Sequence, residues 1–168
     1  MHQATLDLQK AMQKMKKSYR EYYILKMDVR KFFNSIDKKI LYKILKKRIK
    51  DEKLLWLIRQ ILSAQERQKG IEIGNYTSQT FANIYLNELD QYATRKLKIK
   101  NYYRYMDDIV ILARNKNEAK EYLNEIKEFL QKNMLNENFK SKFHRPLMRW
   151  NLLLHEWSLI FHIFVLCS

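Results

Sequence analysis

The chain has 168 residues, of which 33 are Lys or Arg and 18 are Asp or Glu, giving a formal net charge of +15. This length suits one domain or a fragment of a larger one, and a hydrophobic fraction of 46% excludes wholesale disorder. One cysteine, Cys167, excludes a disulfide framework and a cysteine-based zinc site. Two glycines and one proline are too few for an all-β fold, so helices should dominate. No secretory signal pattern opens the chain, which favours a cytoplasmic location.

The positive charge indicates what kind of partner to expect. Basic residues cluster at 14–17, 46–48 and 95–96. A basic excess of this size on a folded domain is typical of proteins that bind polyanions. Taken alone, the charge fits a nucleic acid, an anionic membrane surface or a solvated lysine-rich surface.

Helical and extended patterns alternate along the first half of the chain. The residue pattern predicts a helix over 3–20 and a strand over 22–29 that carries Asp28 near its end. Asp37 is placed to cap a helix that ends near residue 49, and Asp51 to open another through Leu62. Both glycines lie within 64–76, which is therefore the best candidate for a loop.

The second half is predicted to contain a long helix, a hairpin and a further helix. The long helix should begin at Thr77 or Ser78 and end near residue 97. Two β-prone runs, 102–106 and 109–112, flank the polar pair Asp107-Asp108, which is a hairpin signal. A helix over 116–133 follows, and 133–142 begins like another strand.

Residue usage changes abruptly after Lys142, the last lysine of the chain. The segment 143–168 holds the only proline and cysteine, three of the four histidines and two of the three tryptophans. We interpret this change as a frameshifted or degraded reading frame, the alternative being a genuine apolar terminal element. The segment 151–167 is too short and too polar for a comfortable membrane span, so no membrane partner is expected.

Three carboxylates have the positions that metal-dependent chemistry requires. If the strand carrying Asp28 is a neighbour of the hairpin carrying Asp107 and Asp108, the acids meet at one place. Like charges so close repel one another, and they persist by sharing a proton or by holding cations. Carboxylates, water and substrate phosphates are the ligands that Mg²⁺ prefers, and two such ions support nucleotidyl transfer. The plainer interpretation is that Asp-Asp is a common turn dipeptide.

Three motifs in series resemble those of reverse transcriptases, the RNA-directed DNA polymerases. The run 26–33, Lys-Met-Asp-Val-Arg-Lys-Phe-Phe, looks like the first catalytic palm motif, and 105–108, Tyr-Met-Asp-Asp, looks like the Tyr-x-Asp-Asp box. Between them, 73–79, Ile-Gly-Asn-Tyr-Thr-Ser-Gln, looks like the motif that shapes the nascent base pair. The resemblance covers roughly residues 2–140. It implies an α+β polymerase palm, helix-rich, with a small antiparallel sheet of three or four strands and helices packed on one face.

The resemblance also implies a role for each residue of the first and third motifs. Asp28 and Asp107 would bind two Mg²⁺ ions, Val29 would contribute its backbone carbonyl, and Asp108 would support them as the second acid of the box. Tyr105 and Met106 would lie at the primer terminus, although ordinary hairpin packing explains a tyrosine there equally well.

The residues after Asp28 are implied to contact the incoming nucleotide. Phe33 matches the position that screens the 2′ face of the sugar, which would select deoxynucleotides; because Phe32 is adjacent, one of the two rings must face inward. Arg30 and Lys31 would meet the triphosphate or template, or simply solvent.

The middle motif indicates a subfamily. Its residues Ile73, Gly74, Ser78 and Gln79 are implied to bind nucleotide, and their pattern resembles the reverse transcriptases of diversity-generating retroelements. Many other reverse transcriptases have glutamine where Ile73 stands. Because isoleucine cannot donate the corresponding hydrogen bond, discrimination should loosen by about 1 kcal/mol, which predicts low-fidelity copying. Retron-type and phage-defence enzymes have overlapping motifs and stay open as alternatives.

The resemblance implies a palm core cut at both ends. Residues 1–142 would form a partial reverse transcriptase domain, with the palm and the end of the fingers but no thumb, and 143–168 an atypical tail. We therefore expect weak activity or none from this chain alone. Implied partners are an RNA template, a DNA or RNA primer and dNTPs, with an accessory protein of the retroelement as a further candidate. The alternatives are a non-catalytic, basic nucleic-acid-binding remnant and a membrane-surface protein anchored by its tail.

Overall fold

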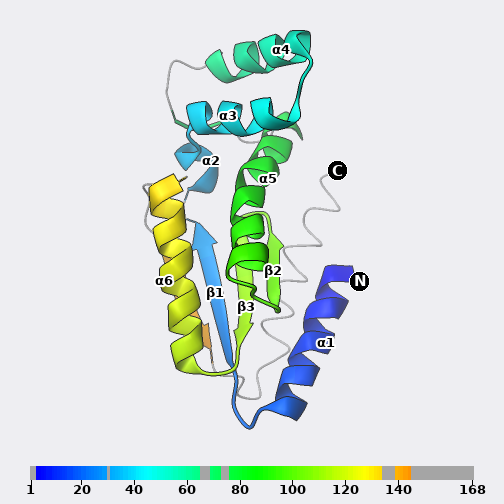
Figure 1. Cartoon of the computed structure of the whole chain (residues 1–168), viewed down its shortest axis with the longest axis vertical. Coiled ribbons are helices and arrows are strands. Elements are labelled where there is room, and N and C mark those ends of the chain that lie inside the picture. Colours follow the sequence, from blue (N-terminus) through cyan, green and yellow to red (C-terminus); the bar gives the residue numbers. More distant parts are fainter. Residues whose placement is uncertain (1–2, 30, 65–68, 73–75, 134–138, 145–168) are drawn as a thin grey trace.

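The computed structural model of the protein describes residues 3–29, 31–64, 69–72, 76–133 and 139–144 (Figure 1). These residues form an α+β fold with a small antiparallel sheet, as predicted. Its elements in chain order are α1 (Gln3–Ser18), β1 (Tyr23–Val29), α2 (Phe32–Ser35), α3 (Lys38–Arg48), α4 (Glu52–Ser63), α5 (Tyr76–Gln91), the π-helical η1 (Tyr92–Lys96), β2 (Tyr102–Tyr105), β3 (Asp108–Ala113), α6 (Lys116–Asn133) and β4 (Phe139–His144).

The four strands lie in the order β2-β3-β1-β4, and every neighbouring pair is antiparallel. The β2–β3 hairpin therefore lies beside the strand that carries Asp28, as the sequence predicted. Successive side chains of a strand point to opposite faces of the sheet. In β1, Leu25 and Met27 are fully buried, whereas Lys26 and Asp28 on the other face are half-buried.

The main hydrophobic core lies between one face of the sheet and the helices α3, α5 and α6. Its fully buried members include Leu25, Ile109 and Ile111 from the strands, and Leu89 and Leu130 from the helices. Burying each such side chain stabilises the fold by about 1.5–3 kcal/mol, so this core fixes the strand register.

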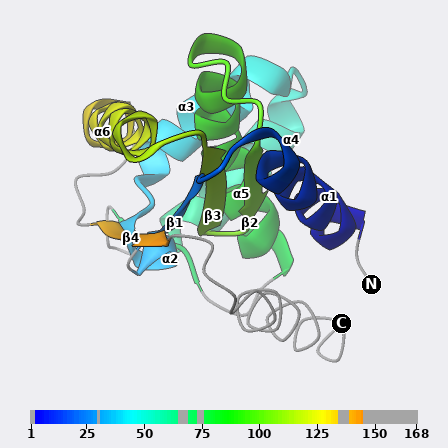
Figure 2. The ribbon, with the colours of Figure 1, turned by 90° about the horizontal axis from the view of Figure 1, so that it is seen from below.

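The opposite face of the sheet is covered in part by α1. Leu8, Met12 and Met15 of this helix pack against Ile24 and Leu112, which alternate with the residues of the main core. In Figure 2, α1 and α6 lie on opposite sides of the strands. The acidic residues near the end of β1 lie on the same face of the sheet as this second core.

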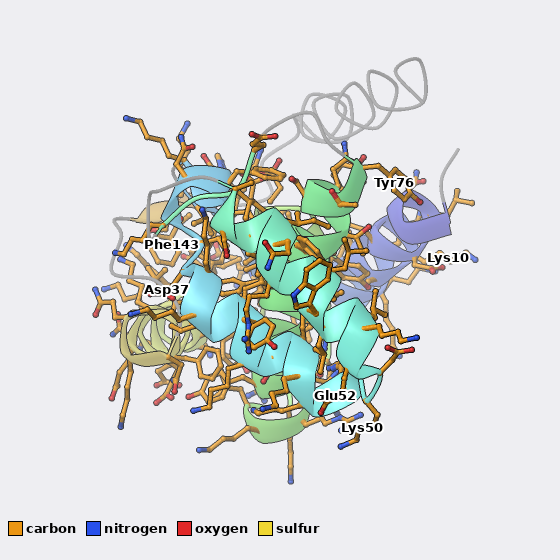
Figure 3. All side chains as sticks on the ribbon, turned by 90° about the horizontal axis from the view of Figure 1, so that it is seen from above. Lys10, Asp37, Lys50, Glu52, Tyr76 and Phe143 are labelled. Carbon is orange, nitrogen blue, oxygen red and sulfur yellow. The ribbon has the colours of Figure 1, made fainter. Side chains whose placement is uncertain are left out.

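The predicted helix caps at Asp37 and Asp51 are both present. The Asp37 carboxylate accepts hydrogen bonds from the backbone N–H groups of Lys39 and Ile40, and the Asp51 carboxylate accepts one from Leu54. Each cap stabilises its helix by about 1 kcal/mol. The two capped helices, α3 and α4, lie side by side, and Figure 3 shows Lys50 and Glu52 together at the connection between them.

Two features were not predicted from the sequence. The helix expected to run to residue 97 is divided, with α5 ending at Gln91 and a π-helical turn following it. The short helix α2 follows Lys31, whose backbone has a left-handed φ of 49°. An element of four residues is too short to give a periodic sequence pattern.

The last described strand, β4, includes residues on both sides of Lys142, after which the residue usage changes. Strand β4 extends to His144, and Phe143 packs against the main core. Of the predicted tail 143–168, residues 145–168 lie outside the described residues. Among the residues that are described, no helix combines the length and apolar character needed to cross a membrane.

Candidate active site

The pairing of β1 with β3 brings two predicted catalytic residues together. Asp28 lies directly opposite Asp108 in the antiparallel register, so both side chains project from the same face of the sheet. Cβ atoms of residues paired in this way are about 4.5–5.5 Å apart. Val29, the predicted source of a backbone carbonyl, is the last residue of β1.

Asp107 lies in the tight turn that joins β2 to β3. The turn residues are Met106 and Asp107, because Asp108 already belongs to β3 and pairs with Tyr105. The expected turn of Asp107 and Asp108 is therefore displaced by one residue. Met106 has a left-handed φ of 51°, a conformation that is uncommon for a residue with a side chain.

Electrostatics show that the three acids share one neighbourhood. The pKa of Asp107 is raised, first because burial disfavours its charged form, and further because the charges of Asp108 and Asp28 repel it. A hydrogen bond from its own backbone and the positive charge of Arg104 offset part of this effect. Such mutual repulsion is relieved when a cation binds between carboxylates.

A lysine that sequence reasoning missed joins the acids. The ammonium of Lys26 lies 3.7 Å from Oδ1 of Asp108, and both side chains are 20% exposed. Lys26 lies two residues before Asp28, so strand alternation puts both side chains on one face. This two-residue spacing is the sequence signal from which Lys26 could have been assigned to the site.

The donor atoms present fit a divalent ion that also binds substrate. Within the described ranges, no group of three or more His, Cys, Asp or Glu is arranged as a ready-made metal site. Magnesium commonly uses one or two carboxylates and completes its shell with water and substrate phosphates. Asp28 and Asp107, with the carbonyl of Val29, are the oxygen donors that could contribute to such a shell.

The two phenylalanines after β1 take different positions. Phe32 is buried in the main core, with its ring edge-on to Phe33 at 5.7 Å between centroids. Phe33 is only half-buried, so the inward-facing ring of the pair is that of Phe32. Lys31 is exposed, and Arg30 lies outside the described residues.

Backbone hydrogen bonds join residues 70 and 71, just before the middle motif, to the segment at the end of the first motif. The N–H of Ile71 donates to the carbonyl of Phe33 at 2.9 Å, and the N–H of Gly70 donates to the carbonyl of Ile36 at 2.9 Å. Gly70 has a φ of +93°, and a Cβ there would lie 3.3 Å from the backbone of Asn34. This close approach explains the glycine.

The middle motif itself is described in part. Ile73 and Gly74 lie outside the described residues, whereas Ser78 and Gln79 lie in the first turn of α5. Ser78 is buried and lines a cavity of about 210 Å³ shared with Ile71. None of Asp28, Asp107 and Asp108 lines this cavity.

The tyrosine of the third motif packs against the second core. Tyr105 is partly buried against the cluster that α1 covers, and Met106 accepts a long hydrogen bond at its Sδ from Asn83 of α5, at 3.4 Å. The turn is therefore held from α5 as well as by the sheet.

This fold and its converging acids agree with the comparison with protein families. The family model described as Reverse transcriptase (RNA-dependent DNA polymerase) matches residues 1–148. The chain therefore belongs to the reverse transcriptase family.

Solved telomerase structures have a similar fold. Telomerase from Candida tropicalis, in complex with the TWJ fragment of telomeric RNA, aligns with a TM-score of 0.64 at 14% identity over 86% of this chain. The corresponding Candida albicans complex aligns with a TM-score of 0.64 at 11% identity over 83% of this chain. The chain spans 29% and 30% of the lengths of those two proteins. A comparison with curated proteins finds no match.

Proposed function

We propose that the chain carries the palm of an RNA-directed DNA polymerase and transfers dNTPs onto a primer 3′-hydroxyl. The observation that carries this proposal is the meeting of three acids: Asp28 opposite Asp108, with Asp107 in the adjoining turn. Burial, and after it the charges of Asp108 and Asp28, raise the pKa of Asp107, and a bound cation would relieve this repulsion.

Asp28, Asp107 and the carbonyl of Val29 would hold two Mg²⁺ ions. When bound, such a pair of ions activates the attacking hydroxyl and stabilises the pyrophosphate leaving group. Asp108 would support this arrangement as the second acid of the box, with its carboxylate paired with Lys26. The exposed Lys31, together with Arg30, would meet the triphosphate.

Phe33 would face the sugar of the incoming nucleotide and exclude a ribose 2′-hydroxyl. Two observations support this assignment: the Phe33 ring is only half-buried, and its carbonyl fixes Ile71 at the approach to the middle motif. Ile73, Gly74, Ser78 and Gln79 would then shape the other side of the nucleotide site. Tyr105 and Met106, at the end of the hairpin, would lie under the primer terminus.

Low-fidelity copying is the finer part of the proposal. Ile73 replaces the glutamine common in this family, as in diversity-generating retroelements, and it offers no side-chain hydrogen bond to orient the substrate. A retron-type enzyme is the alternative subtype. Error rates measured for variants of position 73 would show whether the nucleotide site discriminates weakly or strongly against mismatched nucleotides.

The partners would be an RNA template and a primer. The similar telomerases were solved with RNA, and the formal charge of +15 favours a polyanion. Because the chain spans about a third of those telomerases, we expect the isolated chain to extend primers weakly.

The decisive assay is Mg²⁺-dependent dNTP incorporation on a primed RNA, comparing the wild type with Asp107→Ala. We expect incorporation by the wild type that EDTA and Asp107→Ala both abolish. Incorporation that survives Asp107→Ala would refute the proposed site.

The second candidate is a non-catalytic nucleic-acid-binding protein, which the positive charge favours. It predicts RNA binding that weakens steeply with salt and that Asp28→Ala leaves intact, with no incorporation under any metal. Detection of metal-dependent incorporation by the wild type would exclude this candidate.

A further inference from the structure

The turn that carries Asp107 is held by an arginine from the preceding strand. On β2, Arg104 directs Nη1 to the carbonyl of Met106 at 2.8 Å and to Oδ1 of Asn83 at 3.1 Å. Its Nε and Nη2 donate to the two carboxylate oxygens of Asp90 at 2.8 and 2.7 Å. One guanidinium thus binds the turn and two residues of α5 together.

Asp90 is itself fixed by several donors. Besides the bidentate pair with Arg104, its Oδ1 accepts a hydrogen bond from the hydroxyl of Tyr102 at 2.8 Å. The Arg104 and Asp90 side chains are 12% and 24% exposed. Burial alone would lower the pKa of Arg104, but its hydrogen bonds with Asp90 and the charge of that carboxylate outweigh this, so the pKa is raised. The guanidinium therefore stays charged and its fork geometry is rigid.

The turn needs such support. Met106 has a left-handed φ of 51°, and a non-glycine residue keeps this strained conformation only where its surroundings enforce it. Besides the pairing of β2 with β3, Met106 receives hydrogen bonds from Arg104 at its carbonyl and from Asn83 at its sulfur. Asp107 follows directly, so the orientation of its carboxylate depends on this residue.

We propose that Arg104 and Asp90 are positioning residues that set the place of the Asp107 carboxylate relative to Asp28. This inference rests on the proposed function, because it assigns the pair to the same metal-binding acids. The plainer alternative is an ordinary structural ion pair between β2 and α5. The two interpretations differ in what happens to metal binding when the fold survives.

The test measures Mn²⁺ binding to the full chain by EPR, together with primer extension and thermal unfolding. The variants are Arg104→Gln, Arg104→Lys and Asp90→Asn. We expect each to weaken Mn²⁺ binding by about 10–100-fold, the range typical of residues that orient metal ligands. Lysine should not rescue the site, because it cannot bind Asp90 in a bidentate manner and reach Met106 at once. In primer extension, kcat should fall while the KM for dNTP changes little.

Arg114→Gln is the matched control. Arg114 is also paired with a carboxylate, Glu118, at 2.8 Å, but it is exposed and follows directly after the end of β3 that is far from the turn. The Arg114→Gln variant should bind Mn²⁺ with the affinity of the wild type. Should Arg104→Gln fail to fold, Asn83→Ala replaces it, since Asn83 is exposed and still contacts Met106. We expect a smaller weakening in the same direction.

The outcomes separate the two proposals. Mn²⁺ binding by folded Arg104→Gln or Asn83→Ala that equals the wild type overturns the positioning inference, whatever the activity. If the wild type binds Mn²⁺ but extends no primer, the proposed function fails for this chain acting alone, and the metal affinities decide the positioning inference. If the wild type binds no Mn²⁺, both proposals are overturned.

Discussion

Asp28 and Asp108 are directly paired across β1 and β3, although the described elements α2, α3, α4, α5, η1 and β2 lie between them in the sequence. Their pairing is set by the hydrophobic residues that alternate with them, because a slip of one position would turn Met27 and Ile109 out of the core. The placement of the acids is thus a consequence of ordinary core packing.

The acids should differ in how much activity each supports. Asp28→Asn should reduce Mg²⁺-dependent primer extension by more than about 100-fold, because losing a metal ligand should cost more than losing a residue that only orients one. Asp108→Asn should cost less, because Asp108 is already paired with Lys26. Single-turnover extension on primed RNA measures both, and an equal loss from the two variants would contradict the assignment.

Phe33 should control the choice between deoxynucleotides and ribonucleotides. Phe33→Ala opens space at the sugar and should raise the ratio of rNTP to dNTP kcat/KM by about tenfold or more. Phe32→Leu is the control, because Phe32 is a core residue whose change should lower the free energy of unfolding without changing this ratio. Unaltered sugar selection in Phe33→Ala would remove the residue from the nucleotide site.

Position 73 should set fidelity. Ile73→Gln restores a side chain that can form a hydrogen bond near the substrate. Such a bond contributes about 1 kcal/mol to discrimination, which corresponds to roughly fivefold less misincorporation. The resemblance to the reverse transcriptases of diversity-generating retroelements implies that the effect should be greatest opposite adenine. Sequencing of cDNA products measures it. Equal error rates in both proteins would discard the low-fidelity proposal while leaving the polymerase assignment intact.

Asp107 should destabilise the metal-free protein at neutral pH. Its pKa is raised in the folded state, so the folded protein binds this proton more tightly than the unfolded chain does. The resulting penalty is complete above the raised pKa and disappears as the pH falls below the ordinary aspartate pKa of about 3.9. Asp107→Asn should therefore be more stable than the wild type at pH 7 in EDTA, a difference that urea unfolding would detect.

Two changes of condition check the origin of that effect. The stability difference between the wild type and Asp107→Asn should shrink in acid and also on addition of Mg²⁺, because protonation and cation binding both relieve the repulsion. A wild type that is the more stable protein at pH 7 in EDTA would contradict this electrostatic account.

Gly70 should be sensitive to any side chain. Gly70→Ala places a Cβ 3.3 Å from the backbone of Asn34 at a φ of +93°, and we expect a loss of roughly 1–3 kcal/mol in the free energy of unfolding. Ser63→Ala, at the exposed end of α4, should change stability by less than about 0.5 kcal/mol. Chemical denaturation compares the two variants.

Most of the fold was predictable because its elements carry clear local signals. The caps at Asp37 and Asp51 and the apolar periodicities that follow them predict α3 and α4 closely. The hairpin was predicted, but its turn was placed one residue late. The polar pair Asp107-Asp108 has the composition of a turn, whereas the actual turn uses Met106 in a conformation that its residue type disfavours.

Of the candidate site, only the acidic residues could be predicted from the sequence. Motif resemblance singled out Asp28, Asp107 and Asp108, and the sheet brings them together. Of the supporting residues, Lys26 lies in the first motif but was given no role, and Asp90 and Arg104 lie outside the three motifs. Their contacts depend on strand register and on where α5 passes the hairpin, which are properties of the tertiary structure.

The most direct test of the converging acids replaces Mg²⁺ by Fe²⁺ and generates hydroxyl radicals with ascorbate and peroxide. Radicals formed at a bound ion cut the nearest backbone, so cleavage sites report which segments surround it. We expect cuts near residue 28 and near residue 107 in the same protein, both suppressed by excess Mg²⁺ and by Asp28→Asn. Cleavage at one of these segments without the other, or at neither, would contradict a shared ion-binding site.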